Sequence, residues 1–236
     1  SEKKQVLEML EDIPQNHRSF VVAHDLYRKI IASDDRLEQR AVLALCYKAG
    51  VRLSELHSLS KDMFADDGAT FTLRLDHKPK RRLKTFYSRR IIPLDVLLDE
   101  DEQQYLRDLL QKPLSWLFPL RDRAEHLLKD SVKLQARPLE VSAWALRHSF
   151  ATNAYAALLW PESEQPVHAA FFDPAFISGR NALRNRLCGK TSLGAIGPHA
   201  LATVMGHTSP SRTLFSYAHN LEFILAAHVA TWQKDN

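Results

Sequence analysis

The chain has 236 residues, and its 45% hydrophobic and 25% charged residues are close to the average of globular proteins, which excludes wholesale disorder. It holds only two cysteines and 7 glycines, with no glycine-rich phosphate-binding loop; this excludes a disulfide scaffold and a four-cysteine zinc site and disfavours ATP and NAD chemistry. The net charge of +4 mildly favours a polyanionic partner, and no apolar run is long enough to span a membrane.

Helical periodicity dominates the first sixty residues. Helices are predicted at Glu2–Ile13, Val22–Ala32, Arg36–Lys48 and Ser54–Leu59. Residues 1–19 are therefore expected to form an N-terminal helix and a linker, and residues 20–236 the main domain. The helix at Arg36–Lys48 is apolar on most sides, which predicts burial, and Gly50 is expected to end it in a left-handed conformation.

After residue 60 the hydrophobic period changes from helical to alternating. Strands are predicted at Thr70–Leu75 and Thr85–Leu94, and the acidic segment Asp95–Glu102 leads into a helix through about Leu110. Further helices are predicted at 137–159, Ala200–Met205, Pro210–Ser216 and Leu221–Trp232. The expected fold class is mainly α with a small antiparallel β hairpin or sheet (α+β).

Residues 77–94, which cover most of the loop and the second predicted strand, form a strongly basic segment of the hairpin without a single acidic residue. Its basic residues are Lys78, Lys80, Arg81, Arg82, Lys84, Arg89 and Arg90. One interpretation is a solvated hairpin whose charges keep an edge strand from aggregating. The other is contact with several neighbouring phosphates of a nucleic-acid backbone, which point charges and guanidinium groups bind well.

Four motifs along the chain favour the second interpretation. Gly50–Leu56 reads GVRLSEL, Trp144–Thr152 reads WALRHSFAT, and Met205–Pro210 reads MGHTSP and is followed by Ser216–His219, which reads SYAH. In the hairpin, Lys84–Leu94 carries KT, SRR and PL at fixed spacings. Together and in this order, the motifs resemble those of the tyrosine recombinases, the phage integrase family, over roughly residues 20–225.

The arginines of these motifs suit phosphoryl transfer. A phosphodiester under attack gains negative charge on its non-bridging oxygens, which a planar guanidinium binds through two parallel hydrogen bonds. Arg52 and Arg147 are candidates for this clamp, and His207 would add a third donor. Taken alone, Arg52 could equally be a surface arginine beside Glu55, whereas Arg147 lies in an apolar helix, where a charge needs a partner or a site.

The resemblance implies roles for further residues. Tyr217 would be the nucleophile, although a tyrosine packed in the core is the ordinary alternative. Lys84 would donate a proton to the leaving 5′ oxygen, with Lys80 and Lys78 of the same hairpin as rivals. Glu55 would support the arginines rather than react.

The sequence departs from the family pattern in three places. Trp144 stands where most relatives carry His, and an indole donates a hydrogen bond but accepts no proton. His148 directly follows Arg147, and one residue along a helix is turned by about 100°, so His148 is expected to support packing rather than to substitute for the missing His. An insertion at about 156–196 separates the second and third motifs; it could pack as a subdomain, contact DNA or contact a neighbouring protomer. Finally, few residues precede Arg52, so an N-terminal DNA-clamping domain is expected to be absent or truncated.

The resemblance implies a site-specific DNA recombinase that breaks and rejoins strands in integration or excision through a 3′-phosphotyrosyl intermediate, without a metal, ATP or another cofactor. Residues 20–236 would be its catalytic domain. The expected partner is double-stranded DNA, bound by a homotetramer on paired sites, in the cytoplasm and at the nucleoid rather than at a membrane.

Two alternatives stay open. One is a catalytically degenerate DNA-binding relative, which Trp144 favours, and the other is a type IB topoisomerase-like enzyme. A metal-dependent nuclease is disfavoured because no pair among the 11 histidines has the close spacing of metal ligands.

The last predicted helix, Leu221–Trp232, is apolar for a chain end, so it would fold back on its own domain or, as in relatives, pass to a neighbouring protomer.

Overall fold

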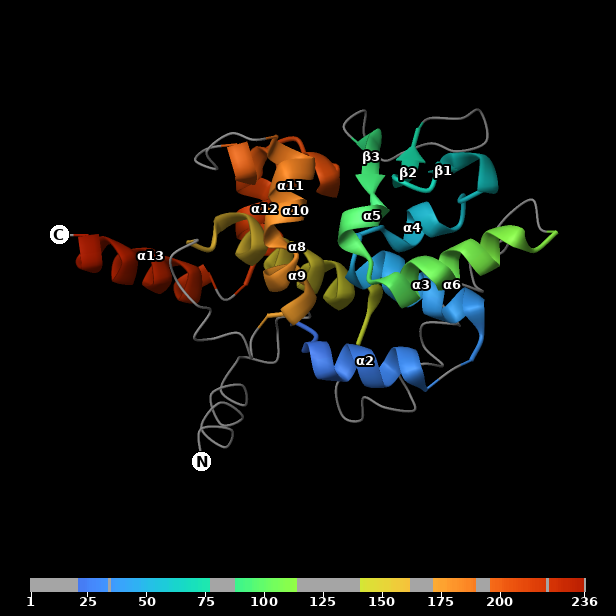
Figure 1. Ribbon diagram of the computed structural model, residues 1–236, viewed down its shortest axis with the longest axis horizontal. Helices are drawn as coiled ribbons and strands as arrows, with labels where there is room; N and C mark the ends of the chain where they lie inside the picture. The colour runs from blue at the N-terminus through green and yellow to red at the C-terminus, as the bar shows by residue number, and fades with distance from the viewer. Residues whose placement is uncertain are drawn as a thin grey trace.

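The computed structural model describes residues 21–33, 35–76, 88–113, 141–161, 172–189, 196–219 and 221–235. The predicted helix at Glu2–Ile13 and residues 77–87 of the basic hairpin lie outside these ranges. The described chain is mostly helical, with one small antiparallel sheet along the upper edge in Figure 1. The predicted fold class is therefore confirmed. None of the described helices is long and apolar enough to cross a membrane.

The N-terminal helices follow the predicted ranges closely. They are α2 (His24–Ala32), α3 (Leu37–Tyr47) and α4 (Leu53–Leu56). Residues 41–47 of α3 are all buried, as the apolar character of this segment predicted. Gly50 has a φ of +60°, and a Cβ at this position would collide with the ring of Phe150. Glycine is thus required both by the left-handed turn and by the close packing of that turn on a helix far along the chain.

The sheet has three strands in the described part of the chain, in the order β1-β2-β3. They are β1 (Phe64–Asp66), β2 (Phe71–Leu75) and β3 (Arg90–Pro93), and the 3₁₀ turn η1 (Lys61–Met63) precedes them. Leu73 pairs with Phe64 on one side and with Ile92 on the other. Strand β1 was not predicted, because it is only three residues long and mostly exposed and therefore shows no alternating pattern.

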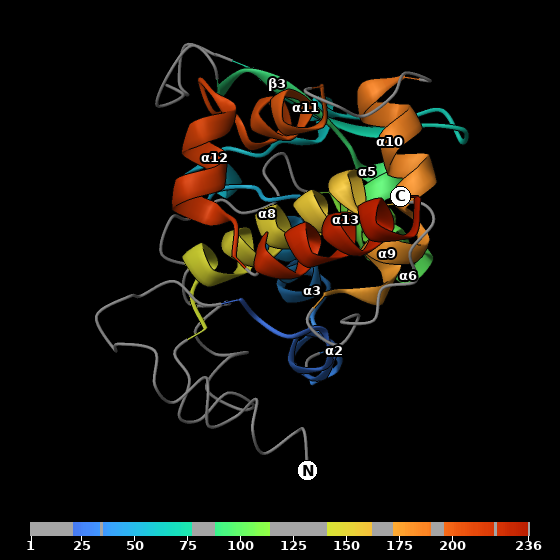
Figure 2. The same ribbon diagram turned by 90° about the vertical axis from the view of Figure 1, so that its left-hand side faces the viewer.

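Helix α8 (Ala143–Leu159) lies at the centre of the fold. Its residues 145–158 are all buried, and it packs against α3, α9, α10, α11, α12 and α13. Figures 1 and 2 show it passing between the N-terminal helices and the C-terminal ones. Because neighbours surround α8, any polar side chain on its buried turns faces the interior of the protein.

The remaining helices cover α8 and the sheet. Between the sheet and α8 in the sequence come α5 (Leu94–Leu97) and α6 (Glu100–Gln111), and after α8 come α9 (Pro174–Ser178), α10 (Arg180–Cys188), α11 (Ile196–Met205), α12 (Pro210–Tyr217) and α13 (Leu221–Asp235). The short helix α5 was not predicted. Ile224 of α13 is buried and α13 packs on α8, whereas Leu225 and Val229 are exposed. Transfer of this helix to a neighbouring protomer stays a prediction.

The described part of the insertion belongs to the core of the domain. Asp173 caps α9 by accepting a hydrogen bond from the Ala175 backbone N–H at 2.9 Å. Its other carboxylate oxygen lies 2.7 Å from Nζ of Lys48, and both side chains are completely buried. His24 of α2 also approaches Asp173, at 3.1 Å. The insertion therefore supplies the counterion of a lysine at the end of α3, and α9 and α10 pack on α8.

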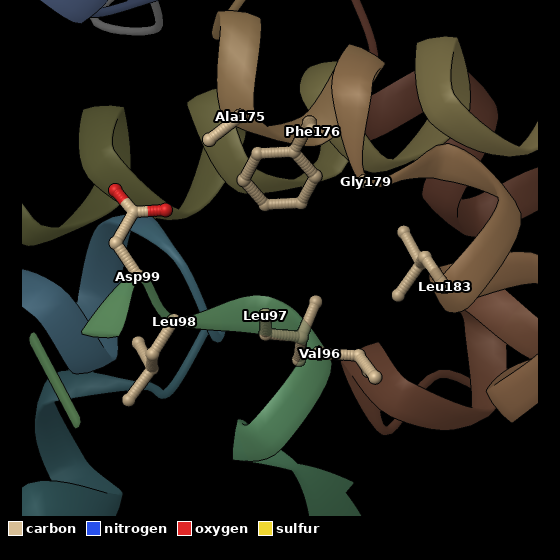
Figure 3. Close-up of a pocket in the computed structure, with 8 residues that line it drawn as sticks. All are labelled: Val96, Leu97, Leu98, Asp99, Ala175, Phe176, Gly179 and Leu183. Carbon is tan, nitrogen blue, oxygen red and sulfur yellow. The ribbon is translucent and has the colours of Figure 1, made fainter.

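A small pocket lies between the insertion and the end of α5 with the two residues that follow it. Phe176 and Leu183 line it from the insertion, and Val96, Leu97 and Asp99 line it from the other side (Figure 3). The Asp99 carboxylate lies 3.3 Å from the same Lys48 ammonium. The pocket is thus the outer edge of the contact by which the insertion is anchored.

Candidate active site

The first motif builds an ion-pair cluster at the start of α4. Arg52 precedes the helix, and the Glu55 carboxylate accepts a hydrogen bond from the Arg52 backbone N–H at 2.8 Å and another from its guanidinium at 2.9 Å. Arg90 of β3 donates two parallel hydrogen bonds to the same carboxylate, each 2.8 Å long. Glu55 thereby joins two arginines that are 38 positions apart, and the expectation that it supports the arginines agrees with this geometry.

The arginines also keep Glu55 ionised. Burial alone would raise the pKa of this carboxyl, but the neighbouring guanidinium groups of Arg90, Arg147 and Arg52 lower it to about 2. The carboxylate is therefore negative throughout the physiological range, and it holds its partners by charge-assisted hydrogen bonds.

Arg90 does not have the role that the sequence suggested. It was predicted to bind DNA, but its side chain is fully buried, with hydrogen bonds to Glu55 and to the Ser88 carbonyl. A guanidinium in this place cannot reach a phosphate outside the protein, so Arg90 is corrected to a residue that positions Glu55. Arg89, by contrast, is half-exposed and pairs with Asp76 at 2.8 Å.

Arg147 of α8 reaches the loops that carry the first and third motifs. It donates hydrogen bonds to the backbone carbonyls of Gly50 and Met205, and its Nη2 lies 3.1 Å from Nε2 of His207. Arg52 donates to the carbonyl of Gly206 at 3.1 Å. Both predicted clamp arginines therefore bind the single turn that follows α11.

The turn at residues 205–207 depends on Gly206. Its φ is +65°, and a Cβ there would come within 2.9 Å of Nη1 of Arg90 and 3.2 Å of Nη1 of Arg52. A side chain would therefore be strained in its backbone and would push against both guanidinium groups. The absence of a side chain at Gly206 lets the guanidinium groups of Arg52 and Arg90 lie against the turn that carries His207.

His207 is held as a neutral imidazole. Its Nδ1 lies 2.7 Å from Oγ1 of Thr213, a buried residue of α12. Since arginine has only donors, Nε2 accepts from Arg147, which leaves the ring proton on Nδ1, directed at Thr213. Burial and the positive charges of Arg147, Arg52, Arg212 and Arg90 lower the pKa of His207 to about 3.

Tyr217 is the last residue of α12, one helical turn beyond Thr213. Helix α12 starts with Pro210 at its first turn and packs against α11 and α8. The backbone that carries the predicted nucleophile thus belongs to the helix that also fixes the His207 ring. The predicted hairpin residues Lys78, Lys80, Arg81, Arg82 and Lys84 lie outside the described residues.

Trp144, which departs from the family pattern, and His148 lie side by side. Trp144 is 56% exposed at the start of α8, and its ring centroid is 4.9 Å from that of His148. His148 is buried, as expected of a packing residue, but it also approaches Nε2 of His219 with its Nδ1 at 3.0 Å. His219 belongs to the second half of the third motif, Ser216–His219, yet sequence reasoning gave it no role.

Sequence reasoning missed two residues that act on His207. Thr213, to which no role was given, orients the His207 ring, and the positive charge of Arg212 acts on the same ring. It also missed the pairing of Arg90 with Glu55, which are 35 positions apart. No local pattern identifies such contacts, although Thr213 lies between the two halves of the third motif, Met205–Pro210 and Ser216–His219.

Comparisons with known proteins agree with this geometry. The profile of the Phage integrase family matches residues 21–158, more than half of the chain, and includes Arg52 and Arg147. Among solved structures, the fold is similar to one titled "Crystal structure of XerA recombinase", with a TM-score of 0.54 and 18% sequence identity. The match covers 91% of this chain and 66% of that one, so this chain spans about two thirds of the XerA chain. No curated protein matches the sequence. The family match, supported by the shared fold, shows that the chain belongs to the phage integrase family, the tyrosine recombinases.

Proposed function

We propose that this chain carries the catalytic domain of a site-specific DNA recombinase, with Tyr217 as its nucleophile. The observation that supports the proposal is the meeting of Arg52, Arg147 and His207, from three distant segments, at the turn of residues 205–207. The guanidinium groups of Arg52 and Arg147 are the planar donors that a phosphate under attack requires, whereas His207, whose ring proton is directed at Thr213, helps to hold Arg147 in place.

The charge of the cluster favours an anion. Arg52, Arg90 and Arg147 carry three positive charges, and Glu55 carries one negative charge, which leaves an excess of two positive charges among these four side chains. His207 stays neutral and adds none. A phosphodiester that gains negative charge in its transition state is stabilised by such a preorganised excess.

In the proposed reaction, the phenolate oxygen of Tyr217 attacks the scissile phosphorus while the bond to the 5′ oxygen breaks. Nearby cations favour the phenolate form of a tyrosine. Lys84 donates a proton to the departing 5′ oxygen, which leaves a 3′-phosphotyrosyl link and a free 5′ hydroxyl. The 5′ hydroxyl of a partner strand then attacks that link and releases Tyr217. The phosphotyrosine conserves the bond energy, so the cycle needs no ATP.

The test is covalent trapping on a nicked duplex, whose short 5′ fragment dissociates after cleavage. Wild-type protein is expected to give a DNA adduct that survives a denaturing gel, and Tyr217→Phe is expected to give none while binding the same DNA. Loss of one hydroxyl removes the nucleophile and almost no contact area. An adduct in Tyr217→Phe would contradict the assignment of the nucleophile.

Trapping, together with relaxation of supercoiled DNA and strand exchange between two duplexes, separates the alternatives. DNA binding without an adduct in the wild type supports a degenerate DNA-binding relative, and relaxation of one supercoiled duplex without exchange between two supports a topoisomerase-like enzyme. Exchange between two duplexes supports the recombinase. Crosslinking on paired sites would then test the proposed homotetramer.

A further inference from the structure

Helix α8 presents a stripe of three side chains to the segment that follows Tyr217. Trp144, His148 and Thr152 are four residues apart, so they lie along one face of the helix. The Trp144 and His148 rings are 4.9 Å apart, and the His148 ring stacks on that of His219 at 5.2 Å with an interplanar angle of 29°. A continuous row of rings therefore runs from the exposed start of α8 to the segment behind the predicted nucleophile.

Residues 218 and 219 are tied down by three hydrogen bonds. The Ala218 backbone N–H donates to the Thr213 carbonyl at 3.1 Å and closes α12. The His219 backbone N–H donates to Oγ1 of Thr152 at 3.0 Å, and its ring meets Nδ1 of His148 at 3.0 Å. Two of these bonds cross to α8, so the end of α12 is fixed to a different helix, not only to its own turns.

The same helix holds the clamp arginine. Arg147 directly precedes His148 and points toward the Gly50 and Met205 carbonyls. A helix of 17 residues that is buried on nearly all sides is a rigid frame, so its two adjacent residues fix two parts of the site relative to each other. Arg147 sets where the phosphate binds, and His148 sets where the chain beyond Tyr217 is held.

We propose that the His148–His219 pair is a positioning device that sets Tyr217 relative to Arg147, with Trp144 covering the pair on its outer side. The proposal rests on the proposed function, because it requires Tyr217 to be the nucleophile. In the pair one imidazole nitrogen donates and the other accepts, so replacement of either ring by an alkyl group removes the bond. In-line attack demands close alignment, and a displacement of about 1 Å can reduce a rate by about a hundredfold.

The experiment compares single-turnover cleavage of the nicked duplex by His148→Leu, His219→Leu and the double variant. His199→Gln is the matched control, because His199 is an exposed histidine of α11 outside the site. At saturating DNA the two single variants are expected to form adduct at least about tenfold more slowly. The DNA concentration for half-maximal rate is expected to change less than about twofold, because no DNA contact is removed.

Two further measurements separate positioning from a general loss of folding. The double variant is expected to be no slower than the slower single variant, because residues that act as a pair are not additive. His148→Gln, which keeps a donor and an acceptor, is expected to recover part of the rate. In His219→Leu, the backbone amide of position 219 is expected to exchange its hydrogen faster than in the wild type, whereas the amides of α3 keep their protection.

The outcomes are distinct. If the wild type forms no adduct, the proposed function fails and not this inference alone. If the wild type does form it, then leucine variants at wild-type rates, fully additive effects, or a raised DNA requirement at an unchanged maximal rate would each overturn the positioning role.

Discussion

Arg90 and Glu55 form a two-pronged ion pair in which both hydrogen bonds measure 2.8 Å and the arginine side chain is completely buried. The pair joins the sheet to the start of α4, and Glu55 in turn holds the backbone and the guanidinium of Arg52. The orientation of Arg52, which is predicted to bind the phosphate, is therefore set through Glu55 by the buried Arg90, which does not contact the phosphate itself.

Removal of one partner of this pair should be costly. Glu55→Ala leaves the buried Arg90 charge without its carboxylate and is expected to lower the free energy of unfolding by about 3–5 kcal/mol. Arg89→Ala is the control, since Arg89 pairs with Asp76 at a half-exposed position, where such pairs contribute about 0–1 kcal/mol. Denaturant unfolding of both variants provides the comparison, and equal losses would contradict the special status of the buried pair.

Gly206→Ala should strain the backbone and, in addition, displace side chains of the candidate site. Gly68→Ala is the matched control, because Gly68 also has a positive φ, +84°, but a Cβ there meets nothing within 4 Å. Strain alone is expected to cost roughly 1–2 kcal/mol at either position. Only Gly206→Ala also displaces Arg52 and Arg90, so its cleavage rate at saturating DNA is expected to fall at least about tenfold, while Gly68→Ala cleaves as the wild type does. Similar rates in the two variants would show that the site tolerates a methyl group beneath His207.

Replacement of the clamp arginines tests their geometry. Arg52→Ala and Arg147→Ala are each expected to slow cleavage of the nicked substrate at least about a hundredfold, the scale of losing one transition-state donor. Arg52→Lys and Arg147→Lys should recover only part of the rate, because an ammonium is a point charge and cannot form two parallel hydrogen bonds. A lysine variant with full activity would speak against two-pronged binding.

His207 should make stability depend on pH. Its pKa falls from an ordinary value of 6.5 to about 3 in the folded protein, so between these values the unfolded chain binds more protons. The free energy of unfolding therefore declines as pH is lowered through this window and is fully present above about 6.5. His207→Gln should show a smaller loss of stability between pH 7 and pH 5 than the wild type does. Glu55 adds to the pH dependence only below its ordinary value of 4.5, where the stability that it contributes is lost as pH falls toward its folded pKa of about 2. Identical pH profiles for His207→Gln and the wild type would refute the buried neutral imidazole.

Lys84 can be tested although it lies outside the described residues. A substrate with sulfur at the 5′ bridging position is expected to rescue Lys84→Ala more than Arg52→Ala, because a thiolate leaves without a proton and only a general acid becomes dispensable. Adduct formation by both variants on the oxygen and sulfur substrates provides the comparison. Equal rescue would remove Lys84 from this role and make Lys80 the next residue to test.

The sequence predicted the helices well because their periodicity is local and strong. The apolar composition of Arg36–Lys48 predicted a buried helix there, and each end of α3 lies within one residue of the predicted end. Strand β1 and helix α5 were missed because three or four residues are too few to show a period. Helices α9 and α10 of the insertion were not predicted either; α9 has five residues, and α10 has only two buried residues, Leu183 and Arg184, and therefore no apolar stripe.

The motifs pointed to the residues of the candidate site, but they did not predict the contacts between those residues. Spacing along the chain pointed to Arg52, Arg147, His207 and Tyr217, but the pairing of Arg90 with Glu55 and of His148 with His219 arises only when distant segments pack. The charge of Arg90 suggested a DNA contact, since composition cannot distinguish a buried arginine from an exposed one.

The ion pair between Lys48 and Asp173 has a consequence for any shortened form of this protein. A version trimmed to the length of compact relatives would lose Asp173 and leave the Lys48 ammonium buried opposite only Asp99 and Glu102. A deletion of this segment and a change at Lys48 therefore have to be made together. Lys48→Met should restore the stability that the deletion alone loses, because it removes the buried ammonium. In the untrimmed chain, the same change should lower stability, because it removes the ammonium partner of the buried Asp173 carboxylate. The insertion and Lys48 are thus energetically coupled, and a loss of either one alone is expected to destabilise the protein.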